Sequence, residues 1–135
     1  MSARAAPGGV GGVVGVGLDA VEVDRYRRVL ARTPGIAART FTEGELAYAR
    51  LVRDPTQRLA VRFAAKEATL KAFGVGLGAC RFHDIEVVRA DGGQPALVLR
   101  GAALDLAAAR GVTRLLVSLT HTDRTAQAIV LALSL

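Results

Sequence analysis

Hydrophobic positions along the chain change their period from one half to the other. In the first half they recur every three to four residues, which is typical of amphipathic helices, whereas the second half holds short apolar runs typical of strands. Four helices are predicted, over Ala20–Ala31, Thr42–Arg50, Thr56–Phe73 and Ala102–Arg110. Five strands are predicted, over Val13–Leu18, Phe82–Arg89, Pro95–Arg100, Val112–Thr120 and Thr125–Leu133.

Capping and turn residues set the predicted boundaries. Asp19 is placed to cap the first helix, and Thr33-Pro34-Gly35 ends it. Thr42 and Glu45 have the spacing of a capping box at the start of the second helix. Asp91-Gly92-Gly93 favours a hairpin between the second and third strands. Because helices come early and antiparallel strands late, we predict an α+β fold in which an antiparallel sheet packs against the long third helix.

Composition narrows the class of protein. A chain of 135 residues with 51% hydrophobic content suits a single domain, which we place at 12–135. The glycine-rich start, 1–11, is predicted to be a flexible tail. No uncharged apolar run reaches the ~18 residues of a membrane span, so none is predicted. Cys80 is the one cysteine, which excludes an internal disulfide and indicates a reducing, cytoplasmic setting.

The net charge of +6 suggests an acidic partner, whether nucleic acid, a phosphorylated small molecule, an acidic protein or a membrane surface, and composition alone does not choose among them. Arg25, Arg28 and Arg32 recur on one face of the first predicted helix. A solvated face explains such a run, but like charges at this spacing repel, so a docking face for an acidic helix is the alternative. Aromatic residues make up 4% of the chain, and only Phe82 falls on a predicted strand, which leaves little surface for stacking nucleic-acid bases.

Glu67 falls on the apolar side of the predicted helix Thr56–Phe73. An ionised carboxylate in such a setting costs several kcal/mol unless a cation compensates it. Lys71, one turn further on, could pair with it within the helix. Alternatively, Asp19 at the end of the first strand could lie beside Glu67, and the two carboxylates would hold a hard cation such as Mg²⁺. Helix capping is the other interpretation of Asp19.

Other side chains suit a phosphate site. Arg62 and Lys66 lie one helical turn apart with the same charge, an arrangement that an anion between them stabilises. His121 ends a predicted strand, where it could act as a base or a phosphate ligand, although a lone histidine is more often structural. Gly15–Ala20 fits the dinucleotide pattern GxGxxA only weakly, because Asp19 would stand among the phosphates.

Four segments together resemble one enzyme family. They read GVGLDAVEVDR at Gly15–Arg25, FTEGELAYA at Phe41–Ala49, RFAAKEATLKAFGVG at Arg62–Gly76 and VSLTHT at Val117–Thr122. Their order and spacing are similar to those of holo-[acyl carrier protein] synthase, the small single-domain type of 4′-phosphopantetheinyl transferase. The resemblance implies transfer of the phosphopantetheine arm of coenzyme A to a serine of apo-acyl carrier protein, with release of adenosine 3′,5′-bisphosphate, in fatty acid or polyketide synthesis.

The resemblance also implies roles for single residues. Asp19 and Glu67 would bind Mg²⁺, and Lys71 would bind a phosphate. The docking face for the acidic helix of the carrier protein would be Arg25, Arg28 and Arg32. The residues lining the coenzyme A site would be Arg62, Lys66, Lys71, Gly74, Gly76 and His121.

Some questions stay open at this stage. The serine proton would leave through Glu67, His121 or a metal-bound water, and the sequence does not rank these bases. The family resemblance further implies a homotrimer with active sites between subunits. Two alternative functions are a basic nucleic-acid-binding module and a Mg²⁺-dependent phosphohydrolase that needs no protein acceptor.

Overall fold

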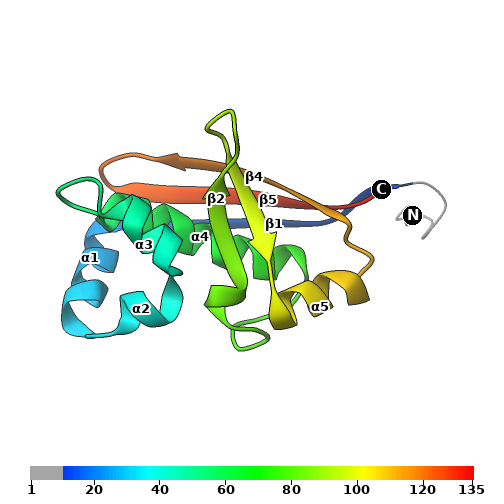
Figure 1. Cartoon of the computed structure of the whole chain (residues 1–135), viewed down its shortest axis with the longest axis horizontal. Coiled ribbons are helices and arrows are strands. Elements are labelled where there is room, and N and C mark those ends of the chain that lie inside the picture. The colour runs from blue at the N-terminus through cyan, green and yellow to red at the C-terminus, as the bar shows by residue number, and fades with distance from the viewer. Residues whose placement is uncertain (1–10) are drawn as a thin grey trace, which may run out of the picture.

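The computed structural model describes residues 11–135, and helices α1–α4 follow the first strand and precede all the others (Figure 1). The predicted tail at 1–11 lies outside the described residues, apart from Gly11. The strands are β1 (Gly12–Glu22), β2 (Ile85–Arg89), β3 (Pro95–Leu99), β4 (Arg114–His121) and β5 (Thr125–Ser134). The helices are α1 (Val23–Arg32), α2 (Ile36–Thr40), α3 (Glu43–Ala49), α4 (Thr56–Ala72), α5 (Gly101–Ala109) and the 3₁₀ turn η1 (Phe82–Asp84).

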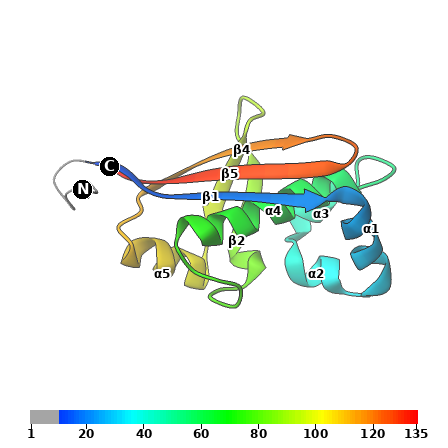
Figure 2. The same ribbon diagram turned by 180° about the vertical axis from the view of Figure 1, so that it is seen from behind.

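The strands form two antiparallel sheets. One has the order β1-β5-β4, and the other is the hairpin β2-β3, which crosses α4 in Figure 1. Seen from behind, α4 runs beside β1, with α1 at one end of the molecule and α5 at the other (Figure 2). The predicted α+β class, with a long helix packed on an antiparallel sheet, is confirmed. No helix among residues 11–135 is long and apolar enough to cross a membrane.

Small residues bring α4 close to the three-stranded sheet. Its alanines Ala64, Ala65, Ala68 and Ala72 pack against buried alanine and valine side chains of β5. A Cβ atom added at Gly17 of β1 would lie 1.8 Å from the backbone carbonyl oxygen of Ala68, which no real contact tolerates. The glycines of the GVG segment therefore let a strand and a helix touch, and this packing accounts for the weak dinucleotide pattern without a nucleotide.

The predicted capping box at the start of α3 is confirmed, and its glutamate also makes contacts outside the helix. The backbone N–H of Glu45 donates to the Thr42 hydroxyl (3.2 Å), and the backbone N–H of Thr42 donates to the Glu45 carboxylate (2.9 Å). That carboxylate also pairs with the Lys66 ammonium at 2.8 Å and accepts the Val87 N–H at 2.8 Å. Glu45 and Lys66 have no exposed side-chain surface, so one buried ion pair ties α3 and α4 to the hairpin.

Three predicted boundaries are wrong. Strand β1 continues to Glu22, because residues from Asp19 onward pair with β5 from Ala128 back to Thr125. Asp19 is consequently a strand residue and does not cap α1, which begins at Val23. The short helix α2 was not predicted, and the strand expected from Phe82 begins at Ile85 after a 3₁₀ turn.

Candidate active site

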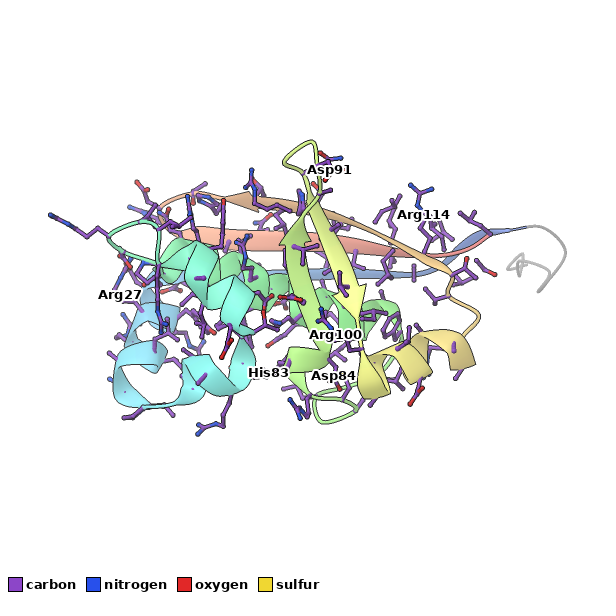
Figure 3. The ribbon with its side chains drawn as sticks, in the orientation of Figure 1. Arg27, His83, Asp84, Asp91, Arg100 and Arg114 are labelled. Carbon is purple, nitrogen blue, oxygen red and sulfur yellow. The ribbon has the colours of Figure 1, made fainter. Side chains whose placement is uncertain are left out.

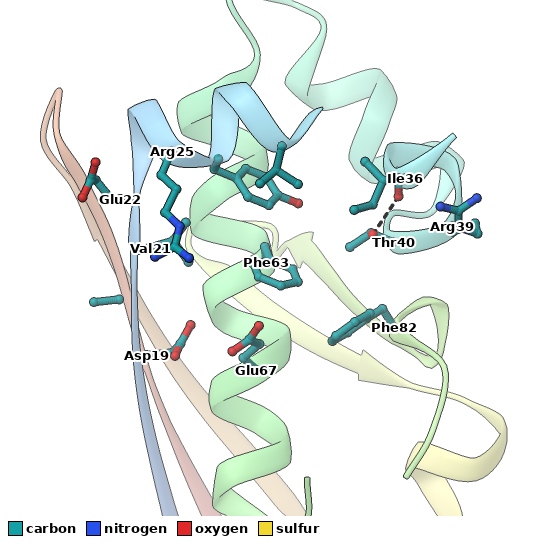
Figure 4. Close-up of a pocket in the computed structure, with 13 residues that line it drawn as sticks. Asp19, Val21, Glu22, Arg25, Ile36, Arg39, Thr40, Phe63, Glu67 and Phe82 are labelled. Atoms are coloured by element: carbon teal, nitrogen blue, oxygen red, sulfur yellow. Dashed lines mark hydrogen bonds between the residues drawn. The ribbon is translucent and has the colours of Figure 1, made fainter. Parts of the chain in front are cut away.

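Asp19 and Glu67 come from different elements and line the same cleft. Asp19 projects from β1 and Glu67 from α4, and Figure 4 shows the two side chains facing each other across the space between these elements. The Lys71 ammonium donates to the Asp19 carboxylate at 3.0 Å and to the Leu18 carbonyl oxygen at 2.9 Å. Lys71 therefore pairs with Asp19, and no Glu67–Lys71 ion pair forms among residues 11–135.

The Glu67 carboxyl stands in an unfavourable place for a charge. Partial burial raises its pKa above the ordinary value, the neighbouring Asp19 raises it further, and Lys71 partly opposes both. Two carboxylates with a single ammonium beside them attract a further cation. The inward-facing carboxylate that the sequence predicted is thus present in the fold, and Lys71 of the same helix compensates it only in part.

An aromatic wall encloses the other side of this cleft, which has a volume of about 870 Å³. Tyr26 and Phe63 stack with ring centroids 5.1 Å apart, and Phe63 meets Phe82 edge-on at 5.5 Å. The Tyr26 hydroxyl is buried and has no hydrogen-bond partner. Burial, with Glu67 adding to it, raises the Tyr26 pKa well above its usual range, so the phenol stays protonated. The cleft therefore has carboxylate groups on one side and aromatic rings on the other.

The donor set of the cleft consists of carboxylate oxygens, which suit a hard divalent cation. Residues 11–135 contain no group of three or more His, Cys, Asp or Glu side chains able to enclose a metal. Two carboxylates alone do not make a zinc or calcium cage. They do match Mg²⁺, which keeps several waters and is bound through one or two carboxylates together with substrate phosphates.

Arg62 and His121 lie in a second cleft, of about 460 Å³, between α4, the β2-β3 hairpin and β4. Neither residue lines the first cleft, and neither Asp19 nor Glu67 lines the second. One subunit therefore divides the predicted site residues into two groups. The carboxylates with Lys71 form the first group, and the arginine and histidine belong to the second.

The structure corrects the prediction that Lys66 lines a coenzyme A site. Its ammonium group is fully buried and donates to the carbonyl oxygens of Phe82 (2.9 Å) and Ile85 in addition to pairing with Glu45. Burial lowers the Lys66 pKa, and the Glu45 carboxylate opposes this shift. Every donor of this side chain is directed into the protein, so it has a structural role.

The backbone geometry at the end of α4 explains why position 74 is a glycine. Gly74 has a φ of +71° immediately after the helix, where the Val75 N–H returns to the Leu70 carbonyl oxygen at 3.0 Å. This left-handed conformation ends the helix and favours glycine. Gly74 and Gly76 are both exposed, so their predicted contact with coenzyme A is sterically open and stays a prediction.

The arginines of α1 differ in their surroundings. Arg25, Arg28 and Arg32 are all exposed, and no ion pair within 11–135 involves them. Arg25 also lines the carboxylate cleft (Figure 4). Arg27, labelled in Figure 3, is the neutralised member of the helix, because it pairs with Asp24 and with Asp54.

Several residues that line the two clefts were not predicted from the sequence. Tyr26, Phe63 and Phe82 form the aromatic wall, and Tyr48, Arg58 and Arg89 line the second cleft. Arg58 had a local signal, because it lies one turn before Arg62 on the same helix face. Tyr48 and Arg89 had none, since α3 and β2 reach the cleft only through the tertiary fold.

Comparisons with known proteins agree with one another. Residues 15–130 match the family model of the 4′-phosphopantetheinyl transferase superfamily. A holo-[acyl-carrier-protein] synthase of Frankia casuarinae is 48% identical over 120 residues, which cover 89% of this chain and 97% of that protein.

Solved structures show the same relationship. The crystal structure of holo-[acyl-carrier-protein] synthase from Neisseria meningitidis has a TM-score of 0.80 at 32% identity and covers 89% of this chain and 98% of its own. The holo-(acyl-carrier-protein) synthase of Bacillus anthracis, solved in complex with CoA (3′,5′-ADP), has a TM-score of 0.75 at 32% identity, with 91% and 98% coverage. The nucleic-acid-binding alternative finds no support in these matches.

Proposed function

Because this chain belongs to the 4′-phosphopantetheinyl transferase superfamily, we propose that it transfers the phosphopantetheine arm of coenzyme A to a serine of apo-acyl carrier protein. Holo-carrier protein and adenosine 3′,5′-bisphosphate are the products. The observation that carries the proposal is the meeting of Asp19 and Glu67 in one cleft of this fold, with Lys71 paired to Asp19. The reaction serves fatty acid or polyketide synthesis.

The carboxylates and Lys71 have separate tasks in this proposal. Asp19 and Glu67 would hold Mg²⁺, which would supply positive charge at the diphosphate, where negative charge develops on the leaving oxygen. The Lys71 ammonium is half exposed beside Asp19, so it is free to turn toward a phosphate oxygen. Its present hydrogen bonds hold it within reach of that position.

The acceptor serine must lose a proton during the attack. Glu67 shares its cleft with Asp19, whereas His121 lies in the second cleft of the same subunit. Within one subunit Glu67 is therefore the better placed of these two side chains. His121 becomes a candidate base only where the second cleft of one subunit faces the first cleft of another.

We further propose that the protein forms a homotrimer. The face of the β1-β5-β4 sheet opposite α4 exposes apolar side chains, among them Val16 (57% exposed), Leu18 (60%) and Leu116 (41%). Such a face marks an interaction surface. Assembly through it covers this surface and offers a way to unite the two clefts into one site between subunits.

The remaining partner and setting follow from charge and cysteine content. The exposed arginines Arg25, Arg28 and Arg32 form a cationic strip that suits the acidic helix of a carrier protein. Arg25 connects this strip to the carboxylate cleft, which would place the acceptor serine beside the metal. The single cysteine favours a reducing, cytoplasmic setting.

A mass-spectrometric assay tests the activity directly. Purified protein is mixed with coenzyme A, Mg²⁺ and an apo-acyl carrier protein, and the carrier is expected to gain one phosphopantetheine. Chelation of Mg²⁺ with EDTA is the control and should stop the gain. Absence of transfer to fatty acid and polyketide carriers alike would reject the proposal. Release of phosphate or nucleotide without a carrier would favour the phosphohydrolase.

The assembly has its own test. Leu18→Glu places a charge on the exposed sheet face without disturbing the α4 side, and light scattering should then report a smaller species than the wild-type trimer. Leu104→Glu, at an exposed leucine of α5 away from this sheet face, is the matched control for adding a carboxylate. A wild-type protein that stays monomeric at micromolar concentration would contradict the trimer but not the transfer reaction.

A further inference from the structure

The Tyr26 hydroxyl is a polar group for which the described part of the chain provides no partner. Tyr26 lines the carboxylate cleft from α1, and only 6% of the residue is exposed. Its ring stacks on Phe63 at a centroid distance of 5.1 Å and an interplanar angle of 19°, which fixes the direction of the side chain. Its hydroxyl is buried and forms no hydrogen bond with residues 11–135. Packing thus holds an unpaired donor at the wall of the cleft.

The buried threonine hydroxyls, in contrast, are paired. Three of them each donate to an acceptor at 2.7 Å, and these are Thr40, Thr56 and Thr69. Buried polar side chains are normally satisfied in this way, because the loss of contact with water carries a cost that a hydrogen bond offsets. Tyr26 departs from this pattern in a cleft of about 870 Å³, which is large enough to hold a ligand. The departure indicates that the acceptor comes from a bound molecule.

The chemistry of the cleft restricts what that acceptor can be. Burial raises the Tyr26 pKa and the nearby Glu67 raises it further, so the hydroxyl keeps its proton and acts as a donor. Neither Asp19 nor Glu67 accepts a hydrogen bond from it. Because both carboxylates line the same cleft, a further anion beside them is unfavourable unless a cation accompanies it. A neutral carbonyl oxygen is therefore the acceptor that suits this position.

The rest of the cleft wall suits a slender, mostly apolar chain. Phe63 and Phe82 meet edge-on at 5.5 Å. Aliphatic side chains continue this wall, among them Val21, Val29 and Ile36. Ligand sites commonly combine such a lining with a few polar groups that fix orientation. The pantetheine arm matches both parts, because it carries two methyl groups on one carbon and two amide carbonyls. It also begins at the diphosphate, which the proposed function assigns to the two carboxylates of this cleft.

We propose that the Tyr26 hydroxyl donates a hydrogen bond to an amide carbonyl oxygen of the pantetheine arm and acts as a specificity-determining residue. The inference rests on the proposed function, because it concerns the substrate of that reaction. No bond to the amide is made or broken during transfer, so the contact is the same in the bound substrate and in the transition state. It should therefore strengthen substrate binding and leave the rate of the chemical step nearly unchanged.

Binding measured without a carrier protein tests the contact. Calorimetric titration of coenzyme A in the presence of Mg²⁺ should give a Kd about 3- to 10-fold higher for Tyr26→Phe than for the wild type, because one neutral hydrogen bond is lost while the ring stays. Adenosine 3′,5′-bisphosphate, which has no arm, should bind both proteins equally. 4′-Phosphopantetheine, which has the arm without the nucleotide, should lose affinity by the same factor as coenzyme A. Equal coenzyme A affinities in the two proteins would overturn the proposal.

The thermal stability of the ligand-free protein separates this role from a structural one. Tyr26→Phe should keep the wild-type Tm or raise it by roughly 2–5 °C, because a buried hydroxyl without a partner is removed. Thr69→Val is the matched control, since it removes a buried hydroxyl that donates to the Ala65 carbonyl oxygen and lies outside both clefts. It should lower the Tm and leave the Kd for coenzyme A unchanged. A lowered Tm in Tyr26→Phe with an unchanged Kd would give the hydroxyl a structural role and reject the proposal.

Transfer kinetics distinguish a failure of this proposal from a failure of the proposed function. Tyr26→Phe should raise KM for coenzyme A by a factor similar to that for Kd, with kcat within about twofold of wild type and KM for the carrier protein unchanged. A fall in kcat at an unchanged KM would contradict a binding role. Weaker coenzyme A binding by Tyr26→Phe, with no transfer by the wild type, would support the Tyr26 contact and reject the reaction. Active transfer with identical KM values in the two proteins would do the reverse.

Discussion

Two lysines of α4, Lys66 and Lys71, each pair with one carboxylate, and the surroundings of the two pairs differ completely. Lys66 meets Glu45 at 2.8 Å with neither side chain exposed, whereas Lys71 meets Asp19 at 3.0 Å with 54% of the lysine side chain exposed. Five residues correspond to a rotation of roughly 140° on a helix, so the two point to different sides. One faces the hairpin and α3, and the other faces β1 and the cleft.

The comparison teaches that an ion pair has a structural or a functional role according to its access to water. Breaking a fully buried pair leaves a charge with no solvent, at a cost of about 3–5 kcal/mol. An exposed pair contributes about 0–1 kcal/mol, so its lysine can leave one oxygen and bind another. The first pair holds the fold together, while the second can exchange partners during a reaction.

Removal of the buried lysine should have the largest effect. Lys66→Met leaves the Glu45 charge buried alone, and the free energy of unfolding should fall by about 3–5 kcal/mol in urea denaturation. The double variant Glu45→Gln, Lys66→Met removes both charges and should recover part of this loss. A Lys66→Met protein as stable as wild type would show that the pair does not hold α3 and α4 together.

Neutralising a cleft carboxylate should reduce activity strongly and leave folding intact. Asp19→Asn or Glu67→Gln should lower kcat for phosphopantetheine transfer by about 10²–10³-fold and weaken the Mg²⁺ dependence, because each removes a proposed metal ligand. Stability should change by no more than about 1 kcal/mol, since the Asp19–Lys71 pair is exposed to solvent. Asp105→Asn on the exposed face of α5 is the matched control. Normal transfer by either cleft variant would refute the metal assignment.

The exposed lysine should behave unlike the buried one. Lys71→Gln should reduce kcat/KM for coenzyme A by about 10- to 100-fold through loss of a charged hydrogen bond to phosphate. Its unfolding free energy should change by less than about 1 kcal/mol. A large loss of stability with unchanged kinetics would reverse the roles that we assign to the two lysines.

Charge reversal on α1 should act on one substrate only. The variant with Arg28→Glu and Arg32→Glu leaves Arg25 in its cleft and should raise KM for the carrier protein about tenfold, more at low salt than at high salt. KM for coenzyme A should stay within error of wild type. A variant with Arg50→Glu and Arg53→Glu, two exposed arginines outside the clefts, controls for the same change in net charge. Unchanged carrier kinetics would reject the docking face.

The exposed pair at the other end of α4 should show the smallest effect. Hydrogen bonds from Thr56 lower the Asp54 pKa below its ordinary value of about 3.9, with Arg27 acting in the same direction. A lowered pKa means that the stabilisation is complete above the unfolded value and is lost as pH falls through the folded value. Asp54→Asn should therefore lower stability by roughly 0.5 kcal/mol near neutral pH, and the difference from wild type in urea denaturation should shrink as the pH falls below the unfolded value.

The sequence predicted those features of the site that depend on neighbouring residues. It did not predict those that depend on residues far apart along the chain. The capping box at Thr42 and Glu45 needs four consecutive residues, and it forms as predicted. The cap assigned to Asp19 failed because β5, over a hundred residues away, pairs with that segment and extends the strand. Asp19 nevertheless lines the cleft with Glu67, because extending β1 leaves its side chain facing α4.

The residues of the two clefts likewise divide into those that the local sequence identifies and those that only tertiary packing brings together. Glu67 stood out in the sequence because an acidic residue on an apolar helix face is locally anomalous. Lys66 lies in the same motif, but nothing local separates a lysine that will be buried from one that will be exposed. Tyr48 and Arg89 could not be paired in advance, since α3 and β2 approach each other only when both pack on α4.

The sequence by itself determined the elements, the α+β class and the family, because periodicity, caps and motifs are properties of neighbouring residues. Only the tertiary structure decided which charges are buried, which carboxylates share a cleft and where three arginines meet a tyrosine. Electrostatic and desolvation energies depend on distances through space and on exclusion of water, and the packing of α4 between the sheet and the hairpin sets both.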